Sequence, residues 1–527
     1  MTSLTENESD EEGSVARAQE VGKSLYEQRQ RNISTGLRSL TVQNFATSIL
    51  AFVFLGALLR LLPSVQYGVY SAVSILVGVA ASVATLGLQY ASARYVSFLQ
   101  ATSEREAYVA ARRVILLSLL TTACISVAFL LMAPFLSLFF TKSPSWSDAF
   151  EIGALWLFSS SIALVLQGVI QGLRKYSLIA WMLFASRVAM VIFTIGGLLL
   201  YRSVLIAVAG WVVYSGILAL WSMWIITSNF GDNAKKGAKV TRFGYSEILR
   251  YSAPLGAAGI LVIITSNSDL IAVGGYLNAT TLAVYNTVVS ISSVLTFVFL
   301  TPLSTALLPE ASSSSQNRDE VSSGIRLAVR FIMLAILPAS FLVAALSHQL
   351  LELFSGGGAY LAGAHSLELI ALFYGFLAIQ STIYSLLQAT GRSLDVFMLS
   401  ALTSVIEIGL SVLLVPEMGI VGAAISRDAT AVVGALVALV FARRYSVRYD
   451  SSLAYVKMFA CSGVLLALLW VLSTFVSASL FTIVPYTLVG CFAFLSCLKW
   501  LRVLRPEDKQ LIGHALPAKL RKVLTYL

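Results

Sequence analysis

Long apolar runs separated by short polar segments dominate the sequence. A helix needs about 20 mostly apolar residues to cross the roughly 30 Å hydrocarbon layer of a bilayer. Segments of alternating polar and apolar residues, which are typical of a transmembrane barrel, do not occur. The pattern therefore predicts an all-α polytopic membrane protein with about fourteen transmembrane helices. They lie near residues 39–60, 69–90, 113–140, 150–172, 177–200, 204–226, 253–275, 283–306, 327–347, 366–388, 396–415, 419–441, 455–474 and 480–500.

The positions of Lys and Arg test this set of spans, because cytoplasmic loops of membrane proteins are enriched in both residues. With a cytoplasmic N-terminus, the inner segments carry 31 Lys and Arg, and the outer segments carry only Arg60, Lys142 and Arg202. A missed or invented span would invert the assignment of every later loop. We therefore expect a multi-pass protein of the cell membrane with both termini in the cytoplasm.

A weak internal repeat divides the spans into two halves. The dipeptide Val-Tyr at 69–70 recurs at 284–285, an offset of 215 residues, and Gln171 and Gln388 lie 217 residues apart in similar surroundings. Two matches at nearly one offset indicate the duplication of a six-helix unit. Since six is an even number, both copies have the same orientation in the membrane, an arrangement typical of transporters with a substrate site between the halves.

The repeat and the charge pattern together predict six regions. The order is a cytoplasmic tail that is first acidic and then basic, a first six-helix lobe, a basic cytoplasmic linker, a second six-helix lobe, an extra helix pair and a basic cytoplasmic tail. Their boundaries are 1–38, 39–226, 227–252, 253–441, 442–500 and 501–527.

Composition narrows the function classes. Hydrophobic residues make up 57% of the chain and charged residues 12%, against about 25% charged residues in soluble domains. A water-soluble enzyme, a disordered chain and a disulfide scaffold are excluded. The net charge is +10, and the basic residues lie between the apolar runs. Basic residues at such positions set the orientation of a membrane protein, so we expect no nucleic-acid partner. The four Cys and three His have no metal-ligand spacing, so we expect neither a metal nor a cofactor.

Several segments resemble landmarks of polysaccharide-biosynthesis flippases, in the order that is usual for that family. This family belongs to the multidrug/oligosaccharidyl-lipid/polysaccharide exporter superfamily. The resemblance covers roughly residues 35–500, and the turn at 62–64 departs from the usual Leu-Gly-Pro pattern. The segments are LLRLLPSVQYGVY at 58–70, LGLQYASARY at 86–95, ILRYSAP at 248–254, QATGR at 388–392 and GIVGAA at 419–424.

The resemblance implies a flippase and not an enzyme. Such a protein moves a polyprenyl- or dolichyl-(pyro)phosphate-linked sugar across the cytoplasmic membrane by alternating access between two lobes, for surface polysaccharide or glycoprotein assembly. The implied partners are the lipid-linked sugar, membrane lipids, a proton or sodium ion, and glycan-assembly enzymes. No covalent chemistry is expected.

Two other functions stay open at this point. An ion-coupled multidrug or metabolite exporter of the same superfamily would have a similar helical pattern, although such relatives typically have twelve helices. A membrane glycosyltransferase or polymerase would place acids or arginines in sizeable external loops. The first outer loop, 61–68, contains no acid, and no paired-carboxylate site emerges.

Three arginines are candidate substrate-binding residues. Arg60 lies at the outer end of the first span and Arg94 at the inner end of the second. Each could therefore receive a phosphate at one mouth of the transporter, or simply extend to the membrane interface. Arg187 lies in the middle of the fifth span, where a charge is costly and usually functional. Neither adjoining hairpin offers it an acid, which leaves substrate contact or a remote ion pair.

The second lobe contains the other charges at membrane depth. Asp269 could bind a coupling proton or cation, or pair with an arginine of the other lobe. Glu407 and Arg427 are each ten residues from Glu417, so an antiparallel hairpin would bring them to one depth and predicts a structural ion pair. Asp428 points about 100° away from Arg427 and needs another partner or a water-lined cavity, which makes it a second candidate for ion coupling.

Overall fold

The computed structural model describes residues 43, 46–100, 103–230, 244–300, 326, 329–389, 393–443, 452–475, 482–501 and 503. All regular structure in these ranges is helical, which confirms the all-α prediction. Eleven helices in these ranges are long and apolar enough to cross a membrane, or up to 12 if one bent pair forms a single span. That pair is Val329–Ala345 and Ser347–Ser355, bent by 72°.

The first-lobe helices follow an apolar helix at Ala46–Leu61. They are α2 (Ser64–Thr85), α3 (Leu88–Gln100), α4 (Glu104–Thr141), the short η1 (Pro144–Trp146), α5 (Ser147–Gly172), α6 (Tyr176–Tyr201) and α7 (Val204–Asn229).

The second-lobe helices begin with α9 (Tyr245–Tyr276), α10 (Ala279–Ser292) and the π-helical turns η2 (Thr296–Leu300) and η3 (Ile332–Ile336). They continue with α13 (Leu337–Ala345), α14 (Ser347–Ser355), η4 (Gly358–Gly363), α15 (Ala364–Ala389) and α16 (Ser393–Arg443). The chain then forms α17 (Ser452–Phe475) and α18 (Ile483–Trp500).

Each of the fourteen predicted spans overlaps one of these apolar helices, and two of them, 396–415 and 419–441, fall together in α16. Within α16, Gly419 has φ 61° and ψ −136°, which is not helical. A Cβ atom built on Gly422 would overlap the carbonyl oxygen of Leu414, so the chain turns back sharply between these residues. The predicted hairpin between the two spans is therefore present inside α16.

Several boundaries differ from the prediction. The second predicted span, 69–90, is interrupted because Leu86 and Gly87 adopt left-handed backbone conformations between α2 and α3. A Cβ atom on Gly87 would meet the backbone of Ser252 and Gly256 in α9, so close helix packing also requires glycine there. The predicted linker 227–252 is shortened at both ends by α7 and α9, and its residues 231–243 lie outside the described residues, as do the tail 1–38 and residues 504–527.

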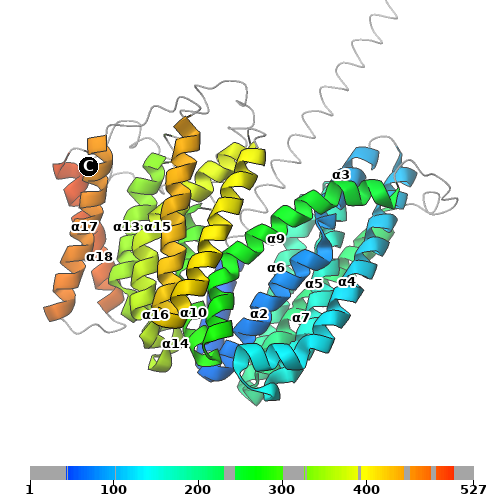
Figure 1. Cartoon of the computed structure of the whole chain (residues 1–527), viewed down its shortest axis with the longest axis horizontal. Coiled ribbons are helices and arrows are strands. Elements are labelled where there is room, and N and C mark those ends of the chain that lie inside the picture. Colours follow the sequence, from blue (N-terminus) through cyan, green and yellow to red (C-terminus); the bar gives the residue numbers. More distant parts are fainter. Residues whose placement is uncertain are drawn as a thin grey trace, which may run out of the picture.

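Figure 1 shows the helices of the first lobe on one side of the molecule and α13, α15 and α16 on the other. The pair α17 and α18 lies at the far edge and packs on α13 through buried residues such as Phe341, Met458 and Phe494. Helix α9 connects the two sides, because it packs on α2, α3 and α4 as well as on α16.

The two lobes meet at the end of the molecule where α2 and α10 begin, which we call the closed end. One continuous cluster of buried apolar side chains joins the lobes there, including Leu58 and Val73 from the first lobe and Val288 and Leu367 from the second. Burial of shared apolar surface therefore holds the lobes together at this end.

Candidate functional site

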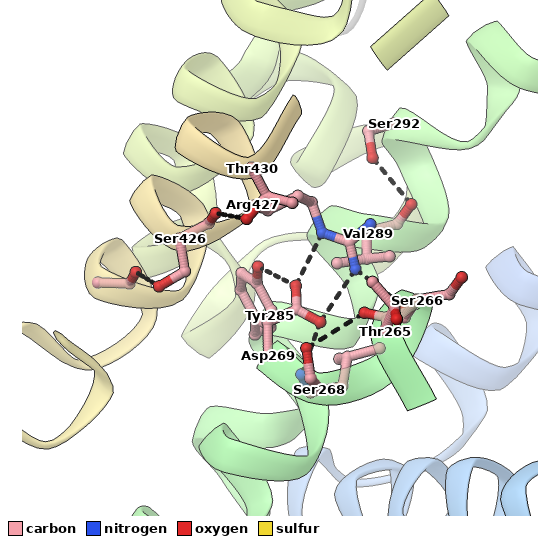
Figure 2. Close-up of polar contacts among 12 residues, drawn as sticks. Thr265, Ser266, Ser268, Asp269, Tyr285, Val289, Ser292, Ser426, Arg427 and Thr430 are labelled. Carbon is pink, nitrogen blue, oxygen red and sulfur yellow. Dashed lines mark hydrogen bonds and ion pairs between the residues drawn. The ribbon is translucent and has the colours of Figure 1, made fainter. Parts of the chain in front are cut away.

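A buried ion pair links α9 and α16 in the second lobe (Figure 2). The guanidinium of Arg427 binds the carboxylate of Asp269 through two hydrogen bonds, Nε to Oδ2 at 2.7 Å and Nη2 to Oδ1 at 3.0 Å. Nη2 also donates to the backbone oxygen of Ser266 at 3.2 Å. Asp269 is completely buried and the Arg427 side chain is 18% exposed. This bidentate geometry is the strong form of an arginine–carboxylate contact.

The remaining acceptor capacity of Asp269 is also used. The hydroxyl of Tyr285 in α10 donates to Oδ2 at 2.6 Å, and the backbone N–H of Leu270 donates to Oδ1 at 2.8 Å. A buried carboxylate with this many donors is well compensated for the loss of water. The group formed by Asp269, Arg427 and Tyr285, which we call the ion-pair site, is therefore built to hold α9, α10 and α16 together.

This geometry corrects one predicted contact and decides between two alternatives. The expected direct pair of Glu407 with Arg427 is wrong, because Arg427 turns toward α9 and takes Asp269 as its partner. An equal distance from the turn of the hairpin does not set the direction in which a side chain leaves its helix. Asp269 does pair with an arginine, although that arginine belongs to the same lobe.

Glu407 and Asp428 lie near the ion-pair site and are 6% and 7% exposed. Both interact electrostatically with Asp269 and Arg427, and the described residues provide neither carboxyl with a hydrogen bond or an ion pair. Within this part of the chain, Asp269 is therefore the carboxylate that Arg427 contacts directly, whereas Glu407 and Asp428 lack direct compensation.

Arg187 lies in the middle of α6 and is half-buried in the first lobe. Its guanidinium carbon is 4.7 Å from the ring centre of Trp211 and 5.6 Å from that of Tyr214, both in α7. Its closest polar contact is Nη1 to the sulfur of Met190 at 3.9 Å. No ion pair of Arg187 occurs within the part of the chain that the structure describes.

The aromatic rings under Arg187 form a layered group from three helices, which we call the aromatic platform. Trp156 of α5 stacks on Trp211, with ring centres 5.1 Å apart and an angle of 17° between the planes. The indole N–H of Trp211 donates to the hydroxyl of Tyr70 in α2 at 2.8 Å. Tyr214 meets Trp211 edge to face. The platform therefore fixes the ring on which the guanidinium rests.

The two other predicted substrate-binding arginines lie elsewhere. Arg60 is exposed at the closed end, and its Nη2 donates to the backbone oxygen of Leu353 in α14 at 2.6 Å, which connects the two lobes. Arg94 is exposed on α3, with its guanidinium carbon 4.3 Å from the ring centre of Tyr251 in α9. The structure therefore brings Asp269 and Arg427 together, whereas Arg60, Arg94 and Arg187 have separate surroundings.

Sequence reasoning missed three neutral side chains at these sites: Tyr285, which donates to Asp269, Trp211, on which Arg187 rests, and Tyr70, which accepts from Trp211. A signal for the two tyrosines was present, because they occupy the same position of the internal repeat. Nothing in the sequence distinguishes Trp211 from other aromatic residues in apolar spans.

The arrangement of helices is similar to that of several solved transporters. The structure of the lipid II flippase MurJ in an inward closed conformation matches with a TM-score of 0.70 at 15% identity, covering 88% of this chain and 98% of that one. An inward-facing multidrug resistance MATE family transporter of the MOP superfamily matches with a TM-score of 0.58 at 16% identity, covering 77% of this chain and 98% of that one.

A third similar structure is a MOP superfamily transporter from Pyrococcus furiosus, with a TM-score of 0.52 at 13% identity, covering 79% of this chain and 96% of that one. No curated protein sequence matches the chain. At these identities the structural matches show that the fold is shared. A sequence profile described as polysaccharide biosynthesis protein matches residues 57–358, more than half of the chain. The chain therefore belongs to the polysaccharide biosynthesis protein family.

Proposed function

We propose that this protein is a flippase for a lipid-linked sugar, moving a polyprenyl- or dolichyl-(pyro)phosphate-linked saccharide across the cytoplasmic membrane by alternating access of its two lobes. The translocated molecule would supply surface polysaccharide or glycoprotein assembly, together with glycan-assembly enzymes. Family membership and the shared fold support this function, and the surroundings of Arg187 support the chemical class of the substrate.

The observation that supports the proposal most directly is that the Arg187 guanidinium rests on aromatic rings and has no ion pair within the described residues. Placing an arginine at the bilayer centre costs about 2.5–3.5 kcal/mol even on insertion scales, so its retention needs a reason. Contact with Trp211 and Tyr214 uses the face of the planar group and leaves its N–H donors, which lie in the plane, available. A guanidinium with free edge donors suits the oxygens of a phosphate.

The comparisons favour a lipid-linked substrate over the exporter alternative. The MurJ flippase match extends over 88% of the chain, and the two multidrug and MOP transporter matches extend over 77% and 79%. A cationic side chain at the bilayer centre also repels the organic cations that many exporters carry.

Glu407 and Asp428 are our candidates for ion coupling. Two buried carboxyls that have no direct partner among the described residues are costly as ions in a low-dielectric interior. Binding a proton or a sodium ion would remove that cost, and the release of this ion would bias the equilibrium between the conformations of the two lobes. Asp269 has no such role in this proposal, because Arg427 already compensates its charge.

We also infer that the closed end faces the outside. This orientation follows the distribution of Lys and Arg, with both termini in the cytoplasm. The contact between α2 and α10 then lies on the outer side, and the contact of α9 with α3 near Gly87 lies on the cytoplasmic side.

The decisive experiment is mass spectrometry of lipid-linked sugars, with assignment to the two leaflets, in cells that lack this protein. One species should accumulate on the inner leaflet and disappear when the wild-type chain is restored. The Arg187→Leu variant should insert normally and fail to restore flipping. Arg202→Asn is the matched control, because it removes an exposed cation from the end of the same helix at a residue with φ 44°, a conformation that asparagine tolerates.

An unchanged lipid pool would contradict the flippase proposal. Export of an organic cation or a metabolite by the purified protein, driven by a proton or sodium gradient, would then establish the alternative function.

A further inference from the structure

The helices α2 and α10 touch at the closed end through their backbones. A Cβ atom built on Gly68 would overlap the carbonyl oxygen of Ala279, the first residue of α10. No side chain fits between the helices at this position. Any larger residue at 68 must therefore separate the lobes or displace one helix.

A polar contact crosses between the lobes about one turn further along α2 and about two turns further along α10. The amide of Asn286 in α10 donates to the hydroxyl of Ser71 in α2 at 2.8 Å and to the hydroxyl of Tyr67 at 3.3 Å. Tyr67 is buried and also meets Tyr360 of the second lobe edge to face.

Ser71 and Asn286 are separated by 215 residues, which is the offset of the internal repeat. Equivalent residues of two related units touch each other only where they lie close to the symmetry axis. The contact between them therefore marks the pseudo-twofold axis of the molecule. When the two lobes separate at this end, the contacts that lie on their shared axis there must open.

The residues that precede this contact belong to the two arginine sites. Tyr70 comes directly before Ser71 on α2 and accepts the hydrogen bond of Trp211, on which Arg187 rests. Tyr285 comes directly before Asn286 on α10 and donates to Asp269. Each helix thus carries a bond across the lobes and a bond to the arginine site of its own lobe, on adjacent residues.

We infer that Gly68, Ser71 and Asn286 form the gate at the closed end, and that Tyr70 connects this gate to anion binding at Arg187. The inference rests on the proposed function for the identity of the anion, but the gate itself is defined by contacts between the lobes. An anion that draws the guanidinium off Trp211 changes the bond from Trp211 to Tyr70, and α2 transmits that change to Ser71.

Two bonds from basic residues reinforce the gate. Arg60 donates to the backbone oxygen of Leu353, and Lys142 Nζ donates to the backbone oxygen of Gly275 at 2.5 Å.

The first test locks the gate in the full-length chain with its four native cysteines replaced by serine. The double variant Ser71→Cys/Asn286→Cys should form a disulfide on oxidation, reduce flipping about tenfold or more, and recover on reduction. The single variants should show no effect of oxidation. Failure to form the disulfide, or unchanged flipping by the oxidised protein, would overturn the gate.

The second test opens the gate at the contact between α2 and α10, with Ser71→Cys present as the reporter in every sample. Gly68→Ala should increase the reaction of Ser71→Cys with a membrane-impermeant maleimide. Gly78→Ala is the matched control, because Gly78 lies in the same helix and a methyl group added there would have no other atom within 4 Å. Equal reactivity in the two variants would show that the helix contact at Gly68 does not close this end.

The third test addresses the link to Arg187 and uses inorganic pyrophosphate as the probe. Pyrophosphate should change the maleimide reactivity of Ser71→Cys in reconstituted protein, and Arg187→Leu or Tyr70→Phe should abolish that response. A response that persists in Arg187→Leu, or no response in the parent protein, would overturn the link. Cysteine reactivity is measured without a lipid substrate, so it tests the gate independently of flipping. A protein that gives the expected cysteine reactivities but flips no lipid-linked sugar would overturn the proposed function and leave the gate intact.

Discussion

Arg427 and Arg187, which both lie inside helices, have opposite surroundings. Arg427 has an acidic partner, and its Nε and Nη2 donors are occupied by Asp269 and Ser266. Arg187 rests on aromatic faces, and its only polar contact with the described residues is a weak one to sulfur. The difference teaches that charge at membrane depth is not by itself a sign of function. What matters is whether the protein already uses the donors of the charged group.

The largest expected effect is on stability, at the ion-pair site. Arg427→Leu leaves the carboxylate of Asp269 buried without its partner, which we expect to lower the free energy of unfolding by about 3–5 kcal/mol. Thermal unfolding of the purified protein in detergent measures the loss. The double variant Asp269→Leu/Arg427→Leu should recover most of it, because it removes both charges. A single variant as stable as the wild type would show that the pair does not hold the helices together.

The next effect is on transport, at the aromatic platform. Arg187→Leu should reduce flipping by about 10- to 100-fold, since a hydrogen bond to a charged group contributes about 1.5–3 kcal/mol. Its thermal stability should stay the same or rise, because the cost of a central arginine is removed. Arg187→Lys should recover only part of the rate, because an ammonium lacks the planar fork. Wild-type flipping by Arg187→Leu would remove this residue from the substrate site.

A smaller effect on stability is expected for Tyr285→Phe. The variant removes one of the donors to Asp269 but keeps the ring and the salt bridge, so the free energy of unfolding should fall by about 1.5 kcal/mol. The equivalent variant of the repeat, Tyr70→Phe, should affect stability less, because Tyr70 accepts from a neutral indole. Thermal unfolding of both variants under the same conditions measures the two losses of stability. A larger loss for Tyr70→Phe than for Tyr285→Phe would contradict the roles assigned to the two tyrosines.

The smallest effect is expected for Trp211→Phe. Phenylalanine keeps an aromatic face under Arg187 but gives a weaker cation–π contact and no bond to Tyr70, so apparent substrate affinity should change by about 0.5–1 kcal/mol, or roughly two- to fivefold. Concentration-dependent flipping in proteoliposomes measures it. A loss as large as that of Arg187→Leu would mean that the indole itself contacts the substrate.

Much of the fold could be predicted because each helix that crosses a membrane must satisfy its backbone hydrogen bonds internally and present apolar side chains to lipid. The spans, the hairpin at Gly419 and the positions of Asp269 and Arg187 inside helices all follow from local sequence. The partner of Arg427 did not follow from local sequence. Glu407 and Asp269 were both candidates within reach of Arg427, and the sequence carries no information on the rotation of one helix against another.

The sequence by itself determined that this is a helical membrane protein of two related lobes, with charges at a few costly positions. Only the tertiary structure decided which of those charges are neutralised, because a partner on another helix is set by packing across hundreds of residues. The same is true of the contact between Ser71 and Asn286. The repeat made these two positions equivalent, but only the packing of α2 against α10 placed both on the axis where the lobes meet.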